Sequence, residues 1–507
     1  MSLKNLRRPA VLALGLLGLA ACSLRPDPLT DADNVNRAQA DKAVIAQNYV
    51  PLDGPLSLGG AIARALKYNY DSQLAAAEIS LQEKQLDLAM AQMLPRLATE
   101  AGYGWRSRPN AAESINVITR QRSLAWSYSE EPNHGNADIA FSWNALDLGV
   151  SYFQAKQQGW RALIAVERRR KVIDNIVKST AQAYWRAAAA SRLLPKIDPM
   201  MVEARRSLAV SQKVGAQNLQ SPLALLDFQQ NMIIVLAELE KIRNDMAAAQ
   251  VEITSLINVP PGSRIVYSTA PEDMKPAFAI DNHKLEDIGL AMRPELRIEA
   301  YQQHIDRQDV YKEILKMMPG VGVFGSLNYD SSNLLYKNTW GELGVRATFN
   351  LFNMVQGPRA IAVAEQSVTL DEQRRIALSV ALLGQINLSI QEYANALDSL
   401  KTAEQMDAIG RQVGRVADNV TLAGVQTEAD RVRRQLTVLT TRVNRDKALA
   451  RVHGALTGVY STVGVDLVPA GADLNDLPEL TRQVEGAIRD WQAGRLPTLP
   501  AAAVAAN

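Results

Sequence analysis

The chain has 507 residues, and its 55 Lys and Arg against 53 Asp and Glu give a formal net charge of +2. This balance argues against a nucleic-acid-binding protein, which needs a basic surface. The hydrophobic fraction of 47% excludes both a disordered chain and a chain with many membrane-spanning helices. The single cysteine excludes an intramolecular disulfide and a zinc site built from several cysteines.

Residues 1–21 have the features of a signal peptide, with basic residues followed by an apolar run that is too short to span a bilayer. The run ends in Leu19-Ala20-Ala21 before Cys22, which resembles the lipobox of bacterial lipoproteins, where the cysteine is lipidated and becomes the first mature residue. Ser23 resembles the signal for outer-membrane sorting. We expect residues 22–55 to be a lipidated extension. The alternative is a plain secretory signal.

The rest of the chain contains two copies of one unit. Pro95 and Pro319 lie 224 residues apart, and each ends a helical stretch and begins a segment of alternating apolar and polar residues. Alternation with a period of two indicates a β-strand. The first repeat, residues 56–258, therefore has predicted strands at about 96–106 and 137–146. The second repeat, residues 281–465, has them at about 320–330 and 343–352.

A long helical hairpin follows each predicted strand pair. From Leu225 to Leu256, apolar residues recur at spacings of three and four, which is typical of a coiled-coil seam or a core stripe. Residues 146–215 would form a helix on the order of 100 Å long, although Pro195 and Pro199 are expected to interrupt it. We expect residues 259–280 to be a linker and residues 466–507 to be a frayed C-terminal tail.

The strand pattern has a consequence for assembly. Each strand has about ten residues, one apolar face with aromatics and one polar face, as in a membrane-spanning β-strand. Four strands cannot close a conducting barrel, and open edges are not tolerated in lipid. The barrel would therefore be shared between chains, and three chains would supply twelve strands.

These features together resemble the TolC-like outer-membrane efflux protein family, in its lipoprotein branch. The resemblance covers roughly residues 55–460 and depends on Cys22, on Pro95 and Pro319, and on the paired segments Trp143–Gly149 and Phe349–Asn353. It implies a mainly α-helical chain with a membrane β-barrel, in a homotrimer whose twelve-strand barrel continues into an α-helical periplasmic tunnel. The implied function is a passive outer-membrane conduit of a tripartite exporter, lying mostly in the periplasm.

The resemblance also implies partners and functional residues. A periplasmic adaptor and an inner-membrane transporter would dock at the hairpin tips, and carboxylates near the tips would ring a constriction. The candidate carboxylates are Asp227, Glu428 and Asp430, although the second hairpin departs from the family pattern at residues 424–428. The candidate docking residues at the turns are Gly215, Asn218, Leu219, Ser221, Asn419, Val420 and Thr421. Each of these positions also fits an ordinary solvated helix face or turn.

Five aromatic residues on the predicted strands are candidates for girdles at the membrane interfaces, and the alternative is core packing in a soluble sheet. They are Tyr103, Trp105, Trp143, Tyr329 and Phe349. The string Gly320-x-Gly322-x-x-Gly325 matches a dinucleotide fingerprint, but a helix precedes it and a strand runs through it, which is the wrong context.

The four histidines have no metal-ligand spacing, and no catalytic motif is present, so we expect no enzyme activity, no metal and no cofactor beyond the covalent lipid on Cys22. Two other classes of protein remain open. One is a lipid-anchored periplasmic coiled-coil scaffold that does not conduct. The other is a periplasmic adaptor, which the two full strand-pair units disfavour.

Overall fold

The computed structural model describes residues 28–113, 115–122, 125–128, 130–216, 222–268, 281–422, 428–469 and 471–497. The chain divides into two compact units, one that ends at Pro51 and one that begins at Leu52. The first unit contains α2 (Asp31–Gln47). Thr30 and Asp33 start this helix with a capping box, in which each side chain accepts a hydrogen bond from the backbone N–H of the other.

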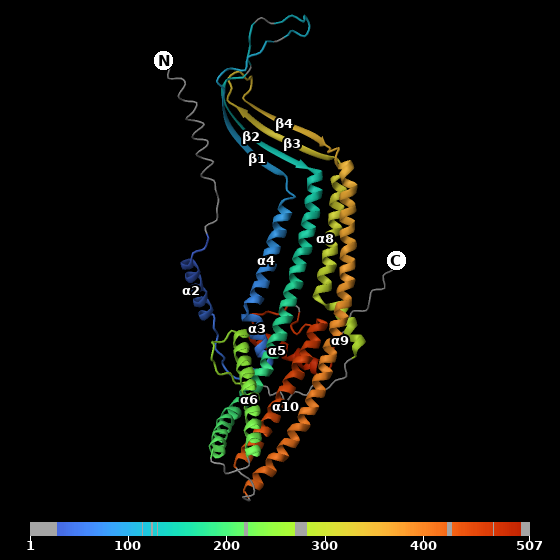
Figure 1. The fold of residues 1–507 in the computed structure, drawn as a ribbon. Helices are drawn as coiled ribbons and strands as arrows, with labels where there is room; N and C mark the ends of the chain where they lie inside the picture. The colour runs from blue at the N-terminus through green and yellow to red at the C-terminus, as the bar shows by residue number, and fades with distance from the viewer. Residues whose placement is uncertain are drawn as a thin grey trace. The chain divides into compact units, whose positions relative to one another are not determined.

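The second unit repeats one succession of elements twice, namely two helices, two strands and a pair of longer helices (Figure 1). The first repeat contains α3 (Leu58–Tyr68), α4 (Tyr70–Ala91), β1 (Arg96–Trp105), β2 (Asn133–Asn144), α5 (Ala145–Ala216) and α6 (Pro222–Leu256). The second contains α7 (Asn282–Met292), α8 (Pro294–Lys316), β3 (Gly320–Asp330), β4 (Thr339–Thr348), α9 (Asn353–Leu422) and α10 (Glu428–Val463). A last helix, α11 (Leu477–Gln492), follows.

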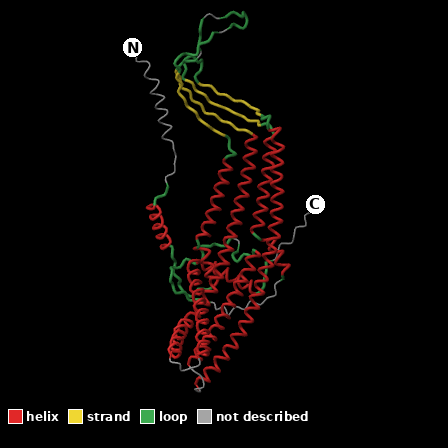
Figure 2. Tube along the Cα trace, in the orientation of Figure 1, coloured by secondary structure: helices red, strands yellow, loops and turns green. Residues whose placement is uncertain are grey.

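The four strands lie together in one antiparallel sheet (Figure 2). Their order is β1-β2-β3-β4, so the pairing of β2 with β3 joins the two repeats. The second strand of each repeat begins four residues earlier than the predicted 137–146 and 343–352. The prediction missed the start of β2 because Asn133 and its neighbours are polar, yet they pair with β1 up to Trp105. Asn144 ends β2 because its Oδ1 accepts a hydrogen bond from the backbone N–H of Leu146, at the start of α5.

α5 has 72 residues and α9 has 70, and both leave the same end of the sheet (Figure 1). The expected interruption at Pro195 and Pro199 was wrong, because α5 runs through both residues. Each proline removes one backbone donor, but Leu193 and Ile197 beside them are fully buried in a hydrophobic cluster with α6 and α10. Packing against these helices therefore holds α5 helical where its local sequence disfavours a helix.

The expectation of a frayed tail was also wrong for α11. This helix buries Leu480, Val484, Ile488 and Trp491 and packs against α3. The Trp491 ring stacks on Tyr460 at 4.3 Å, and the Tyr460 hydroxyl donates a hydrogen bond to the Trp491 carbonyl at 2.7 Å. The apolar stripe of α11 was missed because the sequence on both sides is rich in proline, alanine and glycine.

The described part of the expected linker is hydrogen-bonded to the segment before α3, which in turn is hydrogen-bonded to α5. Leu56 and Tyr267 form a parallel bridge, in which the Leu56 N–H donates to the Val266 carbonyl at 2.7 Å. The Tyr184 hydroxyl donates to the Leu56 carbonyl at 3.0 Å, so this bridge is held against α5. Among the described helices, none has a stretch long and apolar enough to cross a membrane.

Candidate functional site

The two faces of the sheet differ in chemistry along all four strands. Residues opposite one another in the register share a face, and one row across the sheet is Thr99, Ile139, Leu327 and Gly341. The neighbouring rows on this face contain Leu97 with Phe141, and Val323 with Val345. The alternation predicted for each strand is therefore in phase across the whole sheet.

The apolar face is largely uncovered in this chain. Leu343 is 89% exposed, and Leu97, Leu327 and Val345 are each about 70% exposed. Isolated apolar side chains are common on protein surfaces, but a face of this kind spread over four strands marks an interaction surface. Within the described residues, no further strand pairs with the outer edge of β1 or of β4. The sheet therefore has two open edges and one uncovered apolar face.

The five predicted girdle aromatics all lie on or beside this face, and all are at least 42% exposed. Tyr103, Trp105 and Tyr329 are near the end of the sheet that carries the loops, since Trp105 pairs with Asn133. Trp143 and Phe349 are at the opposite end, where the strands continue into α5 and α9. The aromatics thus form two groups separated by a band of aliphatic residues.

The polar face carries unevenly distributed charge. Arg96 and Arg346 lie near its helical end, and the Arg346 guanidinium covers the Phe324 ring at 4.9 Å. Phe324 fits there because position 344 is glycine, where a Cβ atom would be only 2.5 Å from the ring. Toward the loop end, Glu100 and Asp138 lie opposite one another in the register, and no described residue forms an ion pair with either.

At the loop end, His134 connects the two repeats. Its Nε2 lies 3.6 Å from a Glu130 carboxylate oxygen and 3.7 Å from an Asp330 carboxylate oxygen, and its Nδ1 is 3.0 Å from the Glu131 carbonyl. The polar Asn-His-Gly sequence gave no signal for this role.

Glycines 320, 322 and 325 are strand positions, and a Cβ atom at Gly322 would lie 3.1 Å from the Trp143 carbonyl oxygen. A close strand pairing explains these glycines without a nucleotide.

The hairpin tips are partly described. Asp227 is an exposed residue in the first turns of α6, and Asn419 is an exposed residue near the end of α9. Gly215 belongs to the last turn of α5, Val420 and Thr421 belong to α9, and Glu428 and Asp430 open α10. Asn218, Leu219, Ser221 and Cys22 lie outside the described residues.

Buried charged groups between the long helices were missed by sequence reasoning. The Asp407 side chain on α9 is 1% exposed and lies 3.0 Å from Arg411 and 3.8 Å from Arg445. Asp446 on α10 is bound by Arg445 at 2.5 Å. The available signal was the interruption of the apolar seam of α10 at Asp446. In the described residues, no group of three or more His, Cys, Asp or Glu side chains is arranged to hold a metal ion.

Another buried carboxyl, Asp174 on α5, has an unusual pKa. Burial and the nearby Asp466 carboxylate raise the pKa of Asp174 to about 7, although Arg170 and Arg293 act in the opposite direction. One of its oxygens has no hydrogen-bond partner. Arg170 donates to Asp466 at 2.8 Å, so this cluster joins α5 to the segment after α10.

Comparison with known proteins agrees with this architecture. Residues 61–259 match the sequence profile of the family described as outer membrane efflux protein. The fold resembles the CmeC outer membrane channel of Campylobacter jejuni, with a TM-score of 0.62, 13% identity, and coverage of 84% of this chain and 89% of that chain. At such low identity the likeness concerns the fold alone.

Two further solved structures show the same fold. The open state of the MtrE outer membrane channel of Neisseria gonorrhoeae gives a TM-score of 0.59 at 14% identity, over 80% of this chain and 88% of that chain. The outer membrane protein VceC of Vibrio cholerae gives a TM-score of 0.59 at 15% identity, over 80% of this chain and 96% of that chain. No curated protein sequence matches this chain.

Proposed function

We propose that this chain, whose residues 61–259 match the outer membrane efflux protein family, forms an outer membrane channel of an exporter. The observation that carries the proposal is the uncovered apolar face of the β1-β4 sheet, bounded by aromatics at both ends and by two open edges. Lipid accepts such a face, but it does not accept the unpaired backbone groups of an open edge. The edges must therefore pair with other chains.

In the proposed assembly, β4 of one chain pairs with β1 of the next, and three chains close a barrel of twelve strands. The polar face then lines an aqueous passage, as in other barrels of this size. The helices α5 and α9 of each chain extend the passage as a helical tunnel on the periplasmic side. The channel would be a passive conduit without enzyme activity or a cofactor, anchored in the outer membrane by a lipid on Cys22.

The proposal includes two partners that drive the transport. A passive conduit needs an energised inner-membrane transporter, and a periplasmic adaptor would connect that transporter to the hairpin tips near residues 215–221 and 419–421. Asp227, Glu428 and Asp430 of three chains would surround the entrance, where they would favour cations. Isolation of the full chain with an adaptor bound to it would support this part of the proposal.

Two neighbouring residues of β4 allow a direct test of the membrane face. Leu343 lies on the apolar face in the middle of the strand, and Glu342 lies on the polar face. An arginine on the lipid face of a barrel costs about 2–4 kcal/mol at the bilayer midplane, and three copies would multiply this cost. Leu343→Arg should therefore abolish the trimer in the outer membrane fraction, whereas Glu342→Arg should leave it intact.

The readouts are trimer yield in isolated outer membranes and conductance of the purified protein in planar bilayers. Discrete conductance steps from the unchanged chain and from Glu342→Arg would support the channel. Equal assembly of both variants would show that the apolar face does not meet lipid. A trimer that inserts without conducting would instead favour the anchored scaffold.

A further inference from the structure

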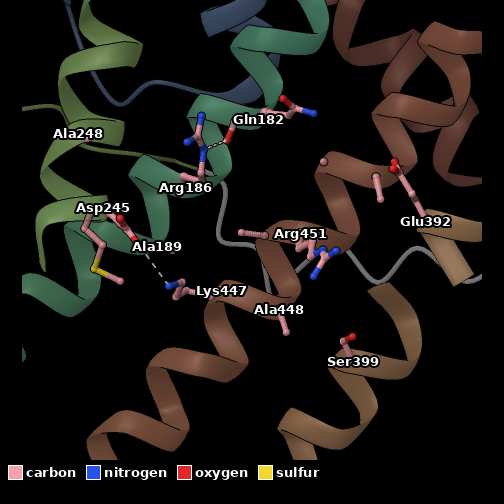
Figure 3. Close-up of a pocket in the computed structure, with 14 residues that line it drawn as sticks. Gln182, Arg186, Ala189, Asp245, Ala248, Glu392, Ser399, Lys447, Ala448 and Arg451 are labelled. Carbon is pink, nitrogen blue, oxygen red and sulfur yellow. Dashed lines mark hydrogen bonds and ion pairs between the residues drawn. The ribbon is translucent and has the colours of Figure 1, made fainter. Parts of the chain in front are cut away.

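A cavity of about 850 Å³ lies between α5, α6, α9 and α10, in the second unit and away from the sheet (Figure 3). Its floor consists of small residues, among them Ala189 of α5, Ala248 of α6, and Ala448 and Gly454 of α10. It lies where the two hydrophobic clusters of the helical region meet, since Ala189 belongs to one cluster and Ala450 to the other. The small side chains leave open the space that longer ones would fill in a bundle core.

The cavity has the size and lining of a small-molecule site. Such sites have volumes of roughly 300–1,000 Å³, a mostly apolar lining and a few polar groups, and they occur between helices of bundles. Met246 adds a flexible apolar wall that adapts to the shape of a ligand. The apolar part of the lining therefore suits a compact hydrophobic body.

Charged side chains at the rim give the cavity a preferred ligand charge. Arg186 forms an ion pair with Glu252 at 2.7 Å, and Lys447 forms a longer one, at 3.6 Å, with Asp245, whose carboxylate also lines the cavity. Arg451 forms no ion pair or hydrogen bond with any described residue. Lys447 and Arg451 are four residues apart on α10, so both are on the same face of that helix.

The opposite wall carries one carboxylate. Figure 3 shows Glu392 and Ser399 on α9, across from Lys447 and Arg451 on α10. Glu392 has no ion-pair partner among the described residues either. A ligand with one negative charge would therefore bind with its acid group at α10, and Glu392 would oppose it from α9.

We propose that this cavity binds an organic anion with an apolar body of one or two rings. Arg451 and Lys447 hold the acid group, because a guanidinium and an ammonium together form charge-assisted hydrogen bonds to a carboxylate or sulfonate. The alanine and methionine floor contacts the apolar body. Binding of the anion is measured without any transport, so the test of this site does not depend on the proposed conduit.

Two probes of the same shape and opposite charge test the proposal. The full chain in a neutral maltoside detergent is titrated with 1-naphthalenesulfonate and with 1-naphthylmethylammonium, and dissociation constants are measured by calorimetry. The sulfonate should bind more tightly than the ammonium. Arg451→Gln should weaken sulfonate binding about tenfold, as expected for one charge-assisted interaction. Glu392→Gln should strengthen it, because the opposing charge is lost.

Arg442→Gln is the matched control, since Arg442 is on the same helix but does not line the cavity. It should leave the dissociation constant unchanged. Ala448→Phe should abolish binding of both probes by filling the cavity, and an unchanged Tm would show that this variant is folded. Equal affinity for the two probes, or equal effects of Arg451→Gln and Arg442→Gln, would overturn the proposal whether or not the protein conducts.

Discussion

A buried polar side chain is compatible with a stable helical region only when a hydrogen-bond partner or an opposite charge compensates for the loss of water. The hydroxyls of Tyr184 and Tyr460 are fully buried, and each donates to a backbone carbonyl, of Leu56 and of Trp491 respectively. Such pairing removes the cost of burying a phenol. Asp174 differs, because two arginines nearby do not outweigh its burial and the neighbouring carboxylates.

We expect Asp174 to make stability depend on pH. Its pKa is about 7 in the folded chain, above the ordinary value of 3.8, so between these values the folded state binds more protons than the unfolded state. Stability should therefore fall as pH rises from about 4 to 7. Asp174→Asn should remove this slope and add on the order of 2 kcal/mol at pH 8.

Thermal unfolding of Asp174→Asn and of the unchanged chain at pH 4 and pH 8 measures this effect. The two proteins should have a similar Tm at pH 4, and the variant should have the higher Tm at pH 8. Asp71→Asn, an exposed carboxyl at the start of α4, is the control and should change neither value. A lower Tm for Asp174→Asn at pH 8 would mean that the arginines bind an ionised Asp174.

Whole helices in this chain are determined more by their packing than by their local sequence. α5 continues through two prolines because Leu193 and Ile197 are buried between α6 and α10. α11 is amphipathic, and its apolar residues lie against α3. In both places tertiary contacts outweigh what the neighbouring residues favour on their own.

The prolines of α5 should therefore lower the stability of the folded chain. A proline in a helix interior is about 3 kcal/mol less favourable than alanine. Pro199→Ala restores a donor that can reach the carbonyl of residue 195, and it should raise the Tm measured by circular dichroism. Pro478→Ala in the first turn of α11 is the control, because proline is compatible with that position and no gain is expected. An equal or lower Tm for Pro199→Ala would indicate that α5 depends on a bend at this residue.

The docking of α11 can be tested at its largest side chain. Trp491 is 7% exposed and stacks on Tyr460. Trp491→Ala should cost about 3–5 kcal/mol, as for other buried tryptophans, and should increase hydrogen exchange in α3 as well as in α11. Arg489→Ala, an exposed residue of the same helix, should change neither. If Trp491→Ala leaves the exchange of α3 unchanged, α11 does not stabilise the core.

The sequence predicted the elements that have a regular pattern and missed those that depend on distant residues. The alternation of apolar and polar residues, as around Leu97 and Leu343, was enough to predict two strands per repeat and the correct face for each side chain. The start of β2 was missed because Asn133 and His134 are held in the sheet by pairing with β1. The ion pair between Asp407 and Arg445 was missed because it joins α9 and α10, which the sequence does not align.

The whole molecule is incomplete as a single chain. Among the described residues no further strand pairs with either edge of its sheet, and in the proposed trimer other copies would supply the missing strands and close the polar face. Any charge on that face is then repeated in every subunit, which strengthens its effect on a passing ion. The described chain places two arginines toward the helical end of this face and Glu100 and Asp138 toward the loop end.

In the proposed trimer, Glu100 and Asp138 should make the channel prefer cations. They face each other in the register without a cationic partner among the described residues, so three chains would supply six carboxylates at one level of the passage. The double variant Glu100→Gln with Asp138→Asn should reduce the cation preference, measured as the reversal potential under a potassium chloride gradient. Glu100→Asp with Asp138→Glu keeps the charge and should keep the preference.

The cation preference should also weaken at high salt, because exposed charges are screened. A reversal potential that is the same in all three proteins would mean that ion selection occurs elsewhere in the passage, such as at the hairpin tips.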